Sequence, residues 1–305
     1  MKISIVIIGY NTAENLKELL VSLKKIKLNK DLFEIIYVDD GSLDSSVNIY
    51  KSCNLKIVKK HYHFKTNRGR VVATSKGVEL ASGEWILFLQ SNVIVDSNIF
   101  KEYIKIISKK RALAFVGQII YESGDLRFQN YLNHKKRGLN SAKNNSLINY
   151  ENLLFGNCLI KKIVFKNICL NLDLKYYGGE ELDFAYNLNQ LYPHMMRYNQ
   201  KSIVMRKSHP KLKEHLLRLY EFGATNLLLL NRPLQKKIIQ FEFLLNNNWA
   251  NRTLIEILNC LLIAIFINLW PLIPTGNFFN NWLSMLYFLP VAFYLFETKK
   301  LEKIN

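Results

Sequence analysis

The sequence is poor in cysteine and in acidic residues. Its four cysteines have neither the close pairing of a zinc site nor the spacing of a disulfide framework, which indicates buried thiols in a reducing compartment. The 24 Asp and Glu residues are outnumbered by 42 Lys and Arg residues, so the formal charge is +18. No zinc-finger, helix-turn-helix or RNA-binding signature accompanies these basic residues. We therefore expect no nucleic-acid partner, and the charge points to anionic membranes or phosphorylated substrates.

Two further sequence features, a signal peptide and a glycine-rich phosphate loop, are also missing. The apolar run at residues 3–8 is too short for a signal peptide and lacks a small-residue cleavage site, so it is predicted to be a core strand. No glycine-rich phosphate loop with a lysine follows it, which argues against nucleotidyl transfer. The chain nevertheless has 305 residues, 49% of them hydrophobic, which is sufficient for a large folded core.

Strand and helix patterns alternate four times in about the first 95 residues, which predicts a doubly wound α/β sheet with mainly parallel strands. The run from Trp85 to Leu89 is too apolar for a half-exposed strand and is predicted to be central. Ligands bind at the carboxyl ends of such strands, so Gln90, Ser91 and Asn92 are expected in a substrate site. The predicted strands lie at 3–8, 33–38, 55–59, 85–89, 112–120 and 159–160, and the predicted helices at 12–23, 71–80, 99–107 and 213–230.

Two acids end the second predicted strand. Asp39 and Asp40 precede Gly41 and Ser42, and the glycine permits a tight turn. Carboxylates at such a strand end can accept hydrogen bonds from a nucleotide base or ribose. The alternative is that one of them only caps the helix that follows.

Four segments, in this order and spacing, resemble the GT-A glycosyltransferases, and specifically their large inverting family 2. They are residues 4–11 (SIVIIGYN), 38–42 (VDDGS), 67–69 (NRG) and 81–89 (ASGEWILFL). The resemblance covers about the first 230 residues and implies a Rossmann-like GT-A domain that binds a UDP- or GDP-sugar. The implied donor-binding residues are Gly9, Tyr10, Asn11, Asp39, Asp40, Asn67, Gly69, Arg70, Gln90, Ser91 and Asn92.

The metal-binding motif of the family is replaced in this chain. Family members usually carry Asp-x-Asp, which holds Mg²⁺ or Mn²⁺ against the donor diphosphate, where this chain has Gln90-Ser91-Asn92. Neutral amides bind such hard cations far more weakly than carboxylates do. If a metal binds, Asn92 and His209 are the candidate ligands, although a lone histidine can equally be structural. Otherwise a basic side chain must supply the positive charge: Arg68, Arg70 or Lys76.

A second group of acids follows two glycines and opens a predicted helix, where the helix dipole also favours carboxylates. The stretch 178–183, GGEELD, resembles the family motif Gly-Glu-Asp-x-Asp, whose central acid is the catalytic base. By position this base is Glu181, and Asp183 either orients it or binds acceptor hydroxyls. Further acceptor-side residues are implied at Gly156, Asn157, Gly179 and Glu180.

The composition changes after residue 233. Residues 254–273 and 279–296 are almost wholly apolar and are joined by an uncharged turn, which predicts a two-helix transmembrane hairpin. Lys and Arg flank both ends, so the positive-inside rule places the catalytic domain in the cytoplasm, on an inner or plasma membrane. A re-entrant, surface-lying or buried helical pair is the alternative. The predicted divisions are 1–230 (a nucleotide-sugar half, 1–115, and an acceptor half, 116–230), an amphipathic segment 231–253, the hairpin 254–297 and a basic tail 298–305.

These features predict a membrane-attached inverting glycosyltransferase of cell-surface polysaccharide synthesis. Glu181 would remove a proton from the hydroxyl of a lipid-linked glycan acceptor as that oxygen displaces the nucleoside diphosphate. The alternative is a catalytically degenerate GT-A module that binds a nucleotide or serves an active transferase as a partner subunit. The neutral triplet 90–92 favours the alternative, and the retained acids Asp39, Asp40, Glu180, Glu181 and Asp183 argue against it.

Overall fold

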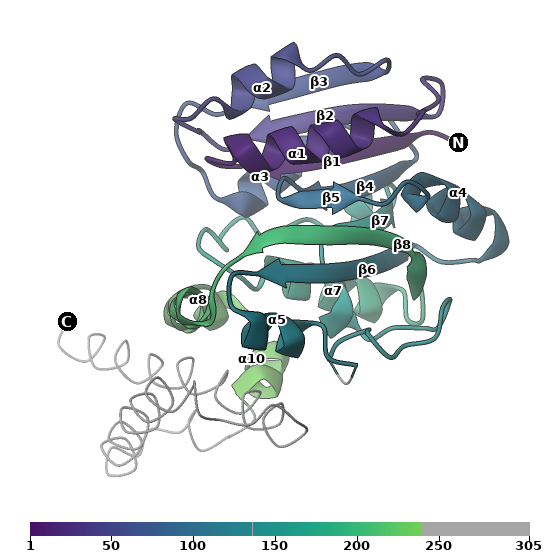
Figure 1. The fold of residues 1–305 in the computed structure, drawn as a ribbon. Coiled ribbons are helices and arrows are strands. Elements are labelled where there is room, and N and C mark those ends of the chain that lie inside the picture. Colours follow the sequence, from purple (N-terminus) through teal and green to yellow (C-terminus); the bar gives the residue numbers. More distant parts are fainter. Residues whose placement is uncertain (136, 240–305) are drawn as a thin grey trace, which may run out of the picture. The chain divides into compact units, whose positions relative to one another are not determined.

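The computed structural model describes residues 1–135 and 137–239 (Figure 1). Within them, eight strands form one sheet in the order β3-β2-β1-β4-β7-β6-β8-β5. The strands are β1 (Ile3–Gly9), β2 (Phe33–Asp39), β3 (Val58–His63), β4 (Trp85–Gln90), β5 (Val93–Val95), β6 (Ala114–Ser123), β7 (Asn157–Lys161) and β8 (Met196–His209). The helices are α1 (Ala13–Lys24), α2 (Ser46–Ser52), α3 (Arg70–Leu80), α4 (Ile99–Lys109), α5 (Leu126–Leu132), the 3₁₀ helix η1 (Tyr150–Asn152), α6 (Val164–Asn167), α7 (Glu180–Leu191), α8 (Leu212–Ala224), α9 (Asn226–Leu229) and α10 (Arg232–Ile239).

The sheet confirms the α/β prediction but is more mixed than expected. Strands β1 to β4 pair in parallel, as a doubly wound sheet requires, and β6 pairs in parallel with β8. Strand β7 is antiparallel to both β4 and β6, and β5 is antiparallel to β8. Four of the seven strand pairings are therefore parallel, and the second half of the sheet is mixed because β7 and β5 run opposite to their neighbours.

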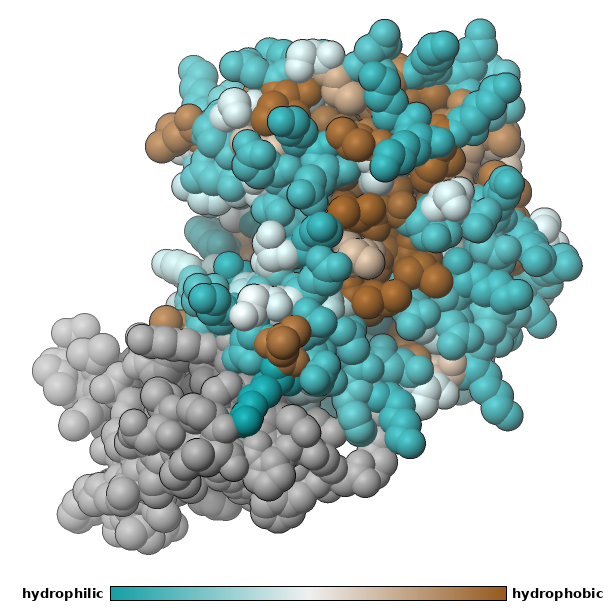
Figure 2. All heavy atoms as spheres, in the orientation of Figure 1, coloured by the Kyte–Doolittle hydropathy of each residue, from teal (hydrophilic) through white to brown (hydrophobic). Residues whose placement is uncertain are grey.

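Both faces of the first half are covered by helices, which explains the continuous apolar runs in its strands. Ile5 and Ile7 of β1 are fully buried in the same cluster as Leu19 of α1. Val6 points to the opposite face and is buried with Val71 of α3. Strand β4, predicted to be central, is buried at every position from Trp85 to Leu89. Hydrophilic residues cover most of the described part of the face in Figure 2, while hydrophobic residues gather near its middle.

Two predicted elements are placed differently. The third strand was expected at 55–59 but spans Val58–His63, because β3 is an edge strand and tolerates the polar residues that follow Val58. The helix expected at 213–230 is broken at Thr225, whose backbone angles (φ −127°, ψ −88°) are not helical. The break allows the Asn226 side chain to donate hydrogen bonds to the carbonyls of Tyr176 and Gly178.

The chain forms two compact units. The first comprises residues 1–175 and 180–209, and the second comprises residues 176–179 and 210–305, described up to residue 239. Among the helices of the described ranges, none combines the length and the apolar character needed to cross a bilayer. The predicted hairpin at 254–297, the tail 298–305 and most of the segment 231–253 lie outside the described residues.

Candidate active site

The parallel strands bring the predicted donor-binding residues to one edge of the sheet. In the registers of β1 with its neighbours, Gly9 lies beside Asp39 and Ile8 lies beside Gln90. The carboxyl ends of these strands are where an open α/β sheet binds its ligands. The residues that directly follow the strands share this edge: Tyr10, Asn11, Asp40, Ser91 and Asn92.

The carboxylate of Asp39 is saturated by its own protein. Its Oδ1 accepts hydrogen bonds from the Tyr37 hydroxyl (2.9 Å) and the Ser42 hydroxyl (2.6 Å). Its Oδ2 accepts from the Ser42 N–H (2.8 Å) and lies 2.8 Å from Nδ1 of His63. Because these four contacts use the lone-pair positions of a buried carboxylate, Asp39 holds the turn after β2 in shape.

Asp40 connects this turn to the loop before α3. Its Oδ1 accepts the Arg68 N–H at 2.8 Å, and Asn67 Oδ1 accepts the Gly69 N–H at 3.1 Å. Burial raises the pKa of Asp40, and the backbone N–H groups of Arg68 and Gly69 partly oppose this effect. Gly69 has φ +91°, and a Cβ there would lie 2.7 Å from the carbonyl oxygen of Lys175. Only glycine therefore fits this position.

The loop after β1 is fixed against the same turn. Asn11 has φ +50°, its N–H donates to the Ser42 hydroxyl (2.8 Å) and its Oδ1 accepts the Leu43 N–H (2.9 Å). Tyr10 next to it is 45% exposed. A rigid loop that presents an exposed aromatic ring is suited to stacking on a nucleotide base.

The neutral triplet occupies the turn between β4 and β5. Gln90 Oε1 is buried and has no hydrogen-bond partner within the described part of the chain, and the Gln90 side chain lies against Gly156. Ser91 is 5% exposed. The Asn92 carbonyl accepts the Lys207 N–H at 2.9 Å, so the triplet is connected to the end of β8.

These side chains are a poor match for Mg²⁺ or Mn²⁺. Gln90 and Asn92 can offer only amide oxygens, whereas hard divalent cations prefer carboxylates. Across residues 1–135 and 137–239, no group of three or more His, Cys, Asp and Glu side chains is arranged to hold a metal ion. His209 is 7% exposed, and its ring packs at right angles to Tyr121 (5.2 Å between ring centroids) and also contacts Phe128. The described residues therefore do not fit the metal that the family resemblance implies.

The acids at the start of α7 form a compact cluster with one arginine. The Arg70 guanidinium, at the start of α3, contacts the Glu180 carboxylate and lies 3.6 Å from Glu181 Oε1. Glu181 Oε1 also accepts the Phe155 N–H at 3.0 Å. The Glu180 side chain is 3% exposed and that of Glu181 is 14% exposed. Of the two adjacent acids, Glu181 is therefore the more accessible to a substrate.

The surroundings of α7 raise the pKa of two of its acids, Glu181 and Asp183. Burial raises the pKa of Glu181; the Arg70 charge opposes this, and the charge of Glu180 adds to it. Burial also raises the pKa of Asp183, whose Oδ2 lies 3.4 Å from Nδ2 of Asn187. A carboxylate with a raised pKa is a stronger base than an exposed one, as general-base catalysis requires.

Two further residues that were predicted on the acceptor side, Asn157 and Gly179, have roles in holding the fold together. Asn157 is fully buried; its Nδ2 donates to the carbonyls of Gln118 (3.0 Å) and Ser202 (2.8 Å), and its Oδ1 accepts the Tyr103 hydroxyl (2.8 Å). The Asn157 amide thus joins β7 to β6, β8 and α4. Gly179 has φ +89°, where a side chain would be strained, so the turn before α7 depends on glycine.

Sequence reasoning missed one basic residue of this site. Arg206 lies opposite Val93 in the β5–β8 register, and its charge lowers the pKa of Glu181. The sequence could have indicated Arg206, since this residue lies three positions before His209, which was considered as a metal ligand. Arg70, which was predicted to bind the donor, contacts the acids of α7.

A half-sheet of parallel strands with polar loops at its carboxyl edge, joined to a carboxylate-bearing helix, defines a GT-A fold. The chain belongs to glycosyl transferase family 2, whose family model matches residues 4–168. Solved structures support the fold. The chain is similar to Staphylococcus aureus TarS 1–349 in complex with UDP, with a TM-score of 0.60 and 16% identity, covering 99% of this chain and 92% of that chain. It is also similar to the mannosyltransferase PcManGT from Pyrobaculum calidifontis in complex with GDP-Man and Mn²⁺ (TM-score 0.64, 14% identity, 95% and 85% covered).

The sequence similarity to curated relatives covers a shorter part of the chain. The poly(ribitol-phosphate) beta-N-acetylglucosaminyltransferase TarS of Staphylococcus aureus is 33% identical over 107 residues, which are 33% of this chain and 18% of TarS. The glycosyltransferase GlyG of Streptococcus pneumoniae is 30% identical over 132 residues, 43% of each chain. The uncharacterized glycosyltransferase MG060 of Mycoplasma genitalium is 29% identical over 120 residues, 38% of this chain and 40% of the relative. The match thus spans less than half of each of these relatives.

Proposed function

We propose that the chain transfers a sugar from a nucleoside-diphosphate donor to a hydroxyl of a cell-surface glycan, with inversion at the anomeric carbon. Family membership supports sugar transfer. TarS has been solved with UDP and with UDP-GlcNAc, and PcManGT with GDP-Man, so UDP- and GDP-sugars are the donors to test. The name of TarS, which acts on poly(ribitol-phosphate), supports an acceptor rich in hydroxyl groups.

The observation that carries the proposal is the position of Glu181. One of its oxygens is held by the Phe155 N–H and faces Arg70, which fixes the orientation of the carboxylate. The other oxygen is the one that can accept the proton of an acceptor hydroxyl. As that hydroxyl oxygen forms a bond to the anomeric carbon, the bond to the diphosphate breaks and the nucleoside diphosphate leaves with the electron pair.

The leaving diphosphate needs positive charge, and basic side chains at the β4–β5 turn can supply it. Lys207 donates its backbone N–H to the Asn92 carbonyl. Its ammonium lies 3.9 Å from Glu18 and 3.8 Å from Glu122. Arg206 precedes it on β8. Lys76, a third basic residue considered for this role, is paired with Glu79 at 2.6 Å. A site built on Arg and Lys would lower the barrier by stabilising charge that develops in the transition state. In such a site a bound Mg²⁺ or Mn²⁺ would have no carboxylate pair at this turn to hold it.

Membrane attachment is part of the proposal and rests on the sequence alone. The apolar runs in residues 254–297 and the flanking basic residues favour a hairpin with both ends in the cytoplasm. Such an attachment would bring the active site to an acceptor that is linked to a lipid. Fractionation of cells that express the full chain, with and without residues 254–305, tests this directly.

The test of the catalytic proposal is Glu181→Gln. The substitution removes the basic oxygen but keeps the size of the side chain, so we expect transfer to fall by about 10²- to 10⁴-fold while nucleotide binding is retained. Transfer of labelled sugar from UDP- and GDP-sugars to a membrane extract measures the rate. Glu79→Gln, at a 65% exposed side chain on α3, is the matched control and should leave the rate unchanged. A Glu181→Gln protein that transfers at the wild-type rate would remove Glu181 from the mechanism.

The neutral triplet favours one alternative, a nucleotide-binding partner subunit without transferase activity. In that case the wild-type chain would bind UDP or GDP but transfer nothing, alone or in the membrane extract. Glu181→Gln and the wild type would then be indistinguishable in every assay. Measurable transfer by the wild-type chain alone excludes this alternative.

A further inference from the structure

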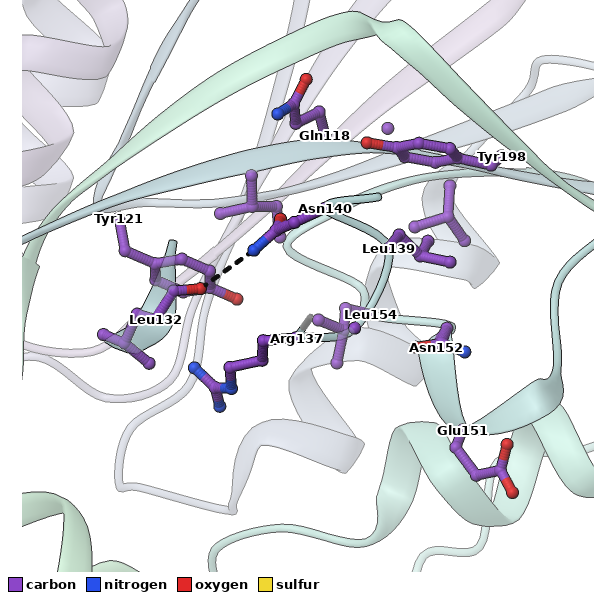
Figure 3. Close-up of a pocket in the computed structure, with 14 residues that line it drawn as sticks. Gln118, Tyr121, Leu132, Arg137, Leu139, Asn140, Glu151, Asn152, Leu154 and Tyr198 are labelled. Atoms are coloured by element: carbon purple, nitrogen blue, oxygen red, sulfur yellow. Dashed lines mark hydrogen bonds between the residues drawn. The ribbon is translucent and has the colours of Figure 1, made fainter. Parts of the chain in front are cut away.

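A pocket of about 250 Å³ lies against strand β6, apart from the residues assigned above (Figure 3). Its walls come from β6, from the segment after α5, from the segment around η1 and from Tyr198 of β8. All of these belong to the first compact unit. The volume is below the usual range of about 300–1,000 Å³ for ligand pockets, so it suits a ligand smaller than a nucleotide.

The hydroxyl of Tyr198 is the polar feature of this pocket that lacks a partner. Tyr198 is 1% exposed, and its hydroxyl makes no hydrogen bond with any residue that the structure describes. Burial raises the pKa of Tyr198 to about 12, so the group keeps its proton at neutral pH and can donate. Buried hydroxyl groups almost always have a partner, and here a bound ligand can provide it.

The rest of the lining is mixed in polarity. The Asn140 amide is fixed by donating to the carbonyls of Leu132 (3.2 Å) and His134 (3.0 Å), which leaves its oxygen as an acceptor (Figure 3). Arg137 and Glu151 contribute one charge of each sign, and apolar side chains lie between them. Such a lining offers hydrogen bonds to hydroxyls and apolar surface to C–H groups. It offers no excess positive charge to a phosphate.

The pocket is connected to the proposed base by a single short segment. Leu154 lines the pocket, and the next residue, Phe155, donates its N–H to Glu181. Gly156, the residue after that, lies against Gln90 of the triplet. A ligand in the pocket would thus lie beside the backbone that holds the base and borders the donor edge.

We propose that this pocket binds one neutral, polyhydroxylated unit of the acceptor, a sugar ring or an open-chain alditol, next to the unit that receives the sugar. The proposal rests on the proposed function, because an acceptor has meaning only for a transferase. Tyr198 donates a hydrogen bond to a ligand hydroxyl, and Asn140 accepts one from another. The pocket is then a specificity-determining site for the acceptor.

Two tyrosine variants separate binding from folding. Tyr198→Phe removes only the unpartnered hydroxyl and keeps the ring. Tyr50→Phe is the matched control: Tyr50 is also 1% exposed, but its hydroxyl donates to the Ile35 carbonyl at 3.1 Å. The full-length chain and both variants are titrated with ribitol and with neutral methyl hexosides, by saturation-transfer NMR. Glycerol 3-phosphate serves as the charged probe, and UDP and GDP are titrated into the same samples by calorimetry.

We expect a neutral polyol to bind, Tyr198→Phe to weaken it about fivefold, as loss of one hydrogen bond implies, and Tyr50→Phe to change it less than twofold. Equal binding by Tyr198→Phe and wild type would overturn the proposal, as would binding of the phosphate probe alone. UDP binding without polyol binding would overturn it while the proposed function stands. Polyol binding that depends on Tyr198, without UDP or GDP binding, would show a polyol pocket but reject the transferase, and with it the role of the pocket as an acceptor site. Binding of none of the probes would overturn both.

Discussion

Buried polar groups are treated differently on the two sides of the sheet. On the β1–β3 side, Asp39 has four partners and Glu34 Oε1 accepts hydrogen bonds from Ser4 and Ser82. Thr12 Oγ1 and Glu34 Oε2 are the exceptions there, and Glu34 Oε2 is ion-paired with Lys60 at 3.0 Å. On the β4–β8 side, buried polar atoms without a hydrogen-bond partner among the described residues are found at Gln90 Oε1, Glu180 Oε2 and the Tyr198 hydroxyl.

We call the β1–β3 side the frame and the β4–β8 side the site. Most buried polar atoms of the frame already have hydrogen-bond partners, so few of them can bind a ligand. The frame instead contributes the fixed shape of its turns and exposed groups such as Tyr10. A side that keeps buried polar atoms unpaired carries a cost in stability, which ligand contacts can offset. Substrate chemistry is therefore expected on the β4–β8 side, and substitutions there should affect activity differently from those in the frame.

The largest effect on stability is expected at Arg70. Its guanidinium neutralises Glu180, whose side chain is 3% exposed, so Arg70→Met would leave a buried negative charge without compensation. Breaking such a pair costs about 3 kcal/mol, and removing both charges in Arg70→Met/Glu180→Gln should restore most of it. Urea denaturation of the wild type, both single variants and the double variant gives the coupling between the two residues.

A control on the same helix calibrates the Arg70 result. Lys76 pairs with Glu79 at 2.6 Å, but the Glu79 side chain is 65% exposed, so Lys76→Met should cost less than about 0.5 kcal/mol. A loss at Arg70 no larger than the loss at Lys76 would show that solvent screens the Arg70 pair. The acids of α7 would then be much less desolvated than their burial indicates.

In the frame, the stabilisation of the fold by the Glu34 carboxylate is predicted to depend on pH. Burial by itself would raise the pKa of Glu34, but hydrogen bonds from Ser4, Ser82 and Lys60 outweigh it and lower the pKa from 4.5 to about 2. Because the folded-state value is the lower one, the stabilisation is complete above pH 4.5 and is lost as the pH falls from 4.5 towards 2. A pKa lowered from 4.5 to about 2 corresponds to about 3 kcal/mol at pH 7. Because glutamine keeps one oxygen that can accept a hydrogen bond, Glu34→Gln should cost about 2 kcal/mol of this.

Denaturation of the wild type and Glu34→Gln between pH 7 and pH 2.5 measures this effect. The difference in the free energy of unfolding should be constant above pH 5 and shrink below it. Asp96→Asn, at an exposed acid before α4, is the control for general acid effects. A difference that stays constant down to pH 2.5 would mean that the Glu34 charge does not stabilise the fold.

The contrast between frame and site also explains what the sequence could predict. Residues 38–42 and 67–69 are short, local patterns, and the structure places the first at the end of β2 and the turn after it, and the second in the loop before α3. The contact between Arg70 and Glu180 joins residues 110 positions apart, and no local pattern reveals it. The same holds for Tyr198 of β8, which reaches a pocket built mainly from residues 116–154. Strand β3 was misplaced because an edge strand lacks the apolar pattern that marks a central one.

The smallest effect is expected from removing divalent metal. Gln90 and Asn92 offer amide oxygens only, so the dissociation constant of UDP, or of GDP if the chain prefers it, should differ by less than about threefold between Mn²⁺ and EDTA. The converse experiment rebuilds the acid pair: Gln90→Asp/Asn92→Asp should bind the nucleotide at least about tenfold more tightly in Mn²⁺ than in EDTA. Calorimetry on both proteins gives the four constants.

A wild-type protein that loses the nucleotide in EDTA would contradict the metal-free site, and His209 or Asn92 would then be the first ligands to substitute. A rebuilt pair that shows no metal response would mean that the turn between β4 and β5 lies away from the diphosphate. The orphaned oxygen of Gln90 would then need another partner, and the β4–β8 side would act on the acceptor rather than on the donor. If the wild type is indifferent to metal and the rebuilt pair responds, the turn faces the diphosphate, and the positive charge there comes from the chain itself.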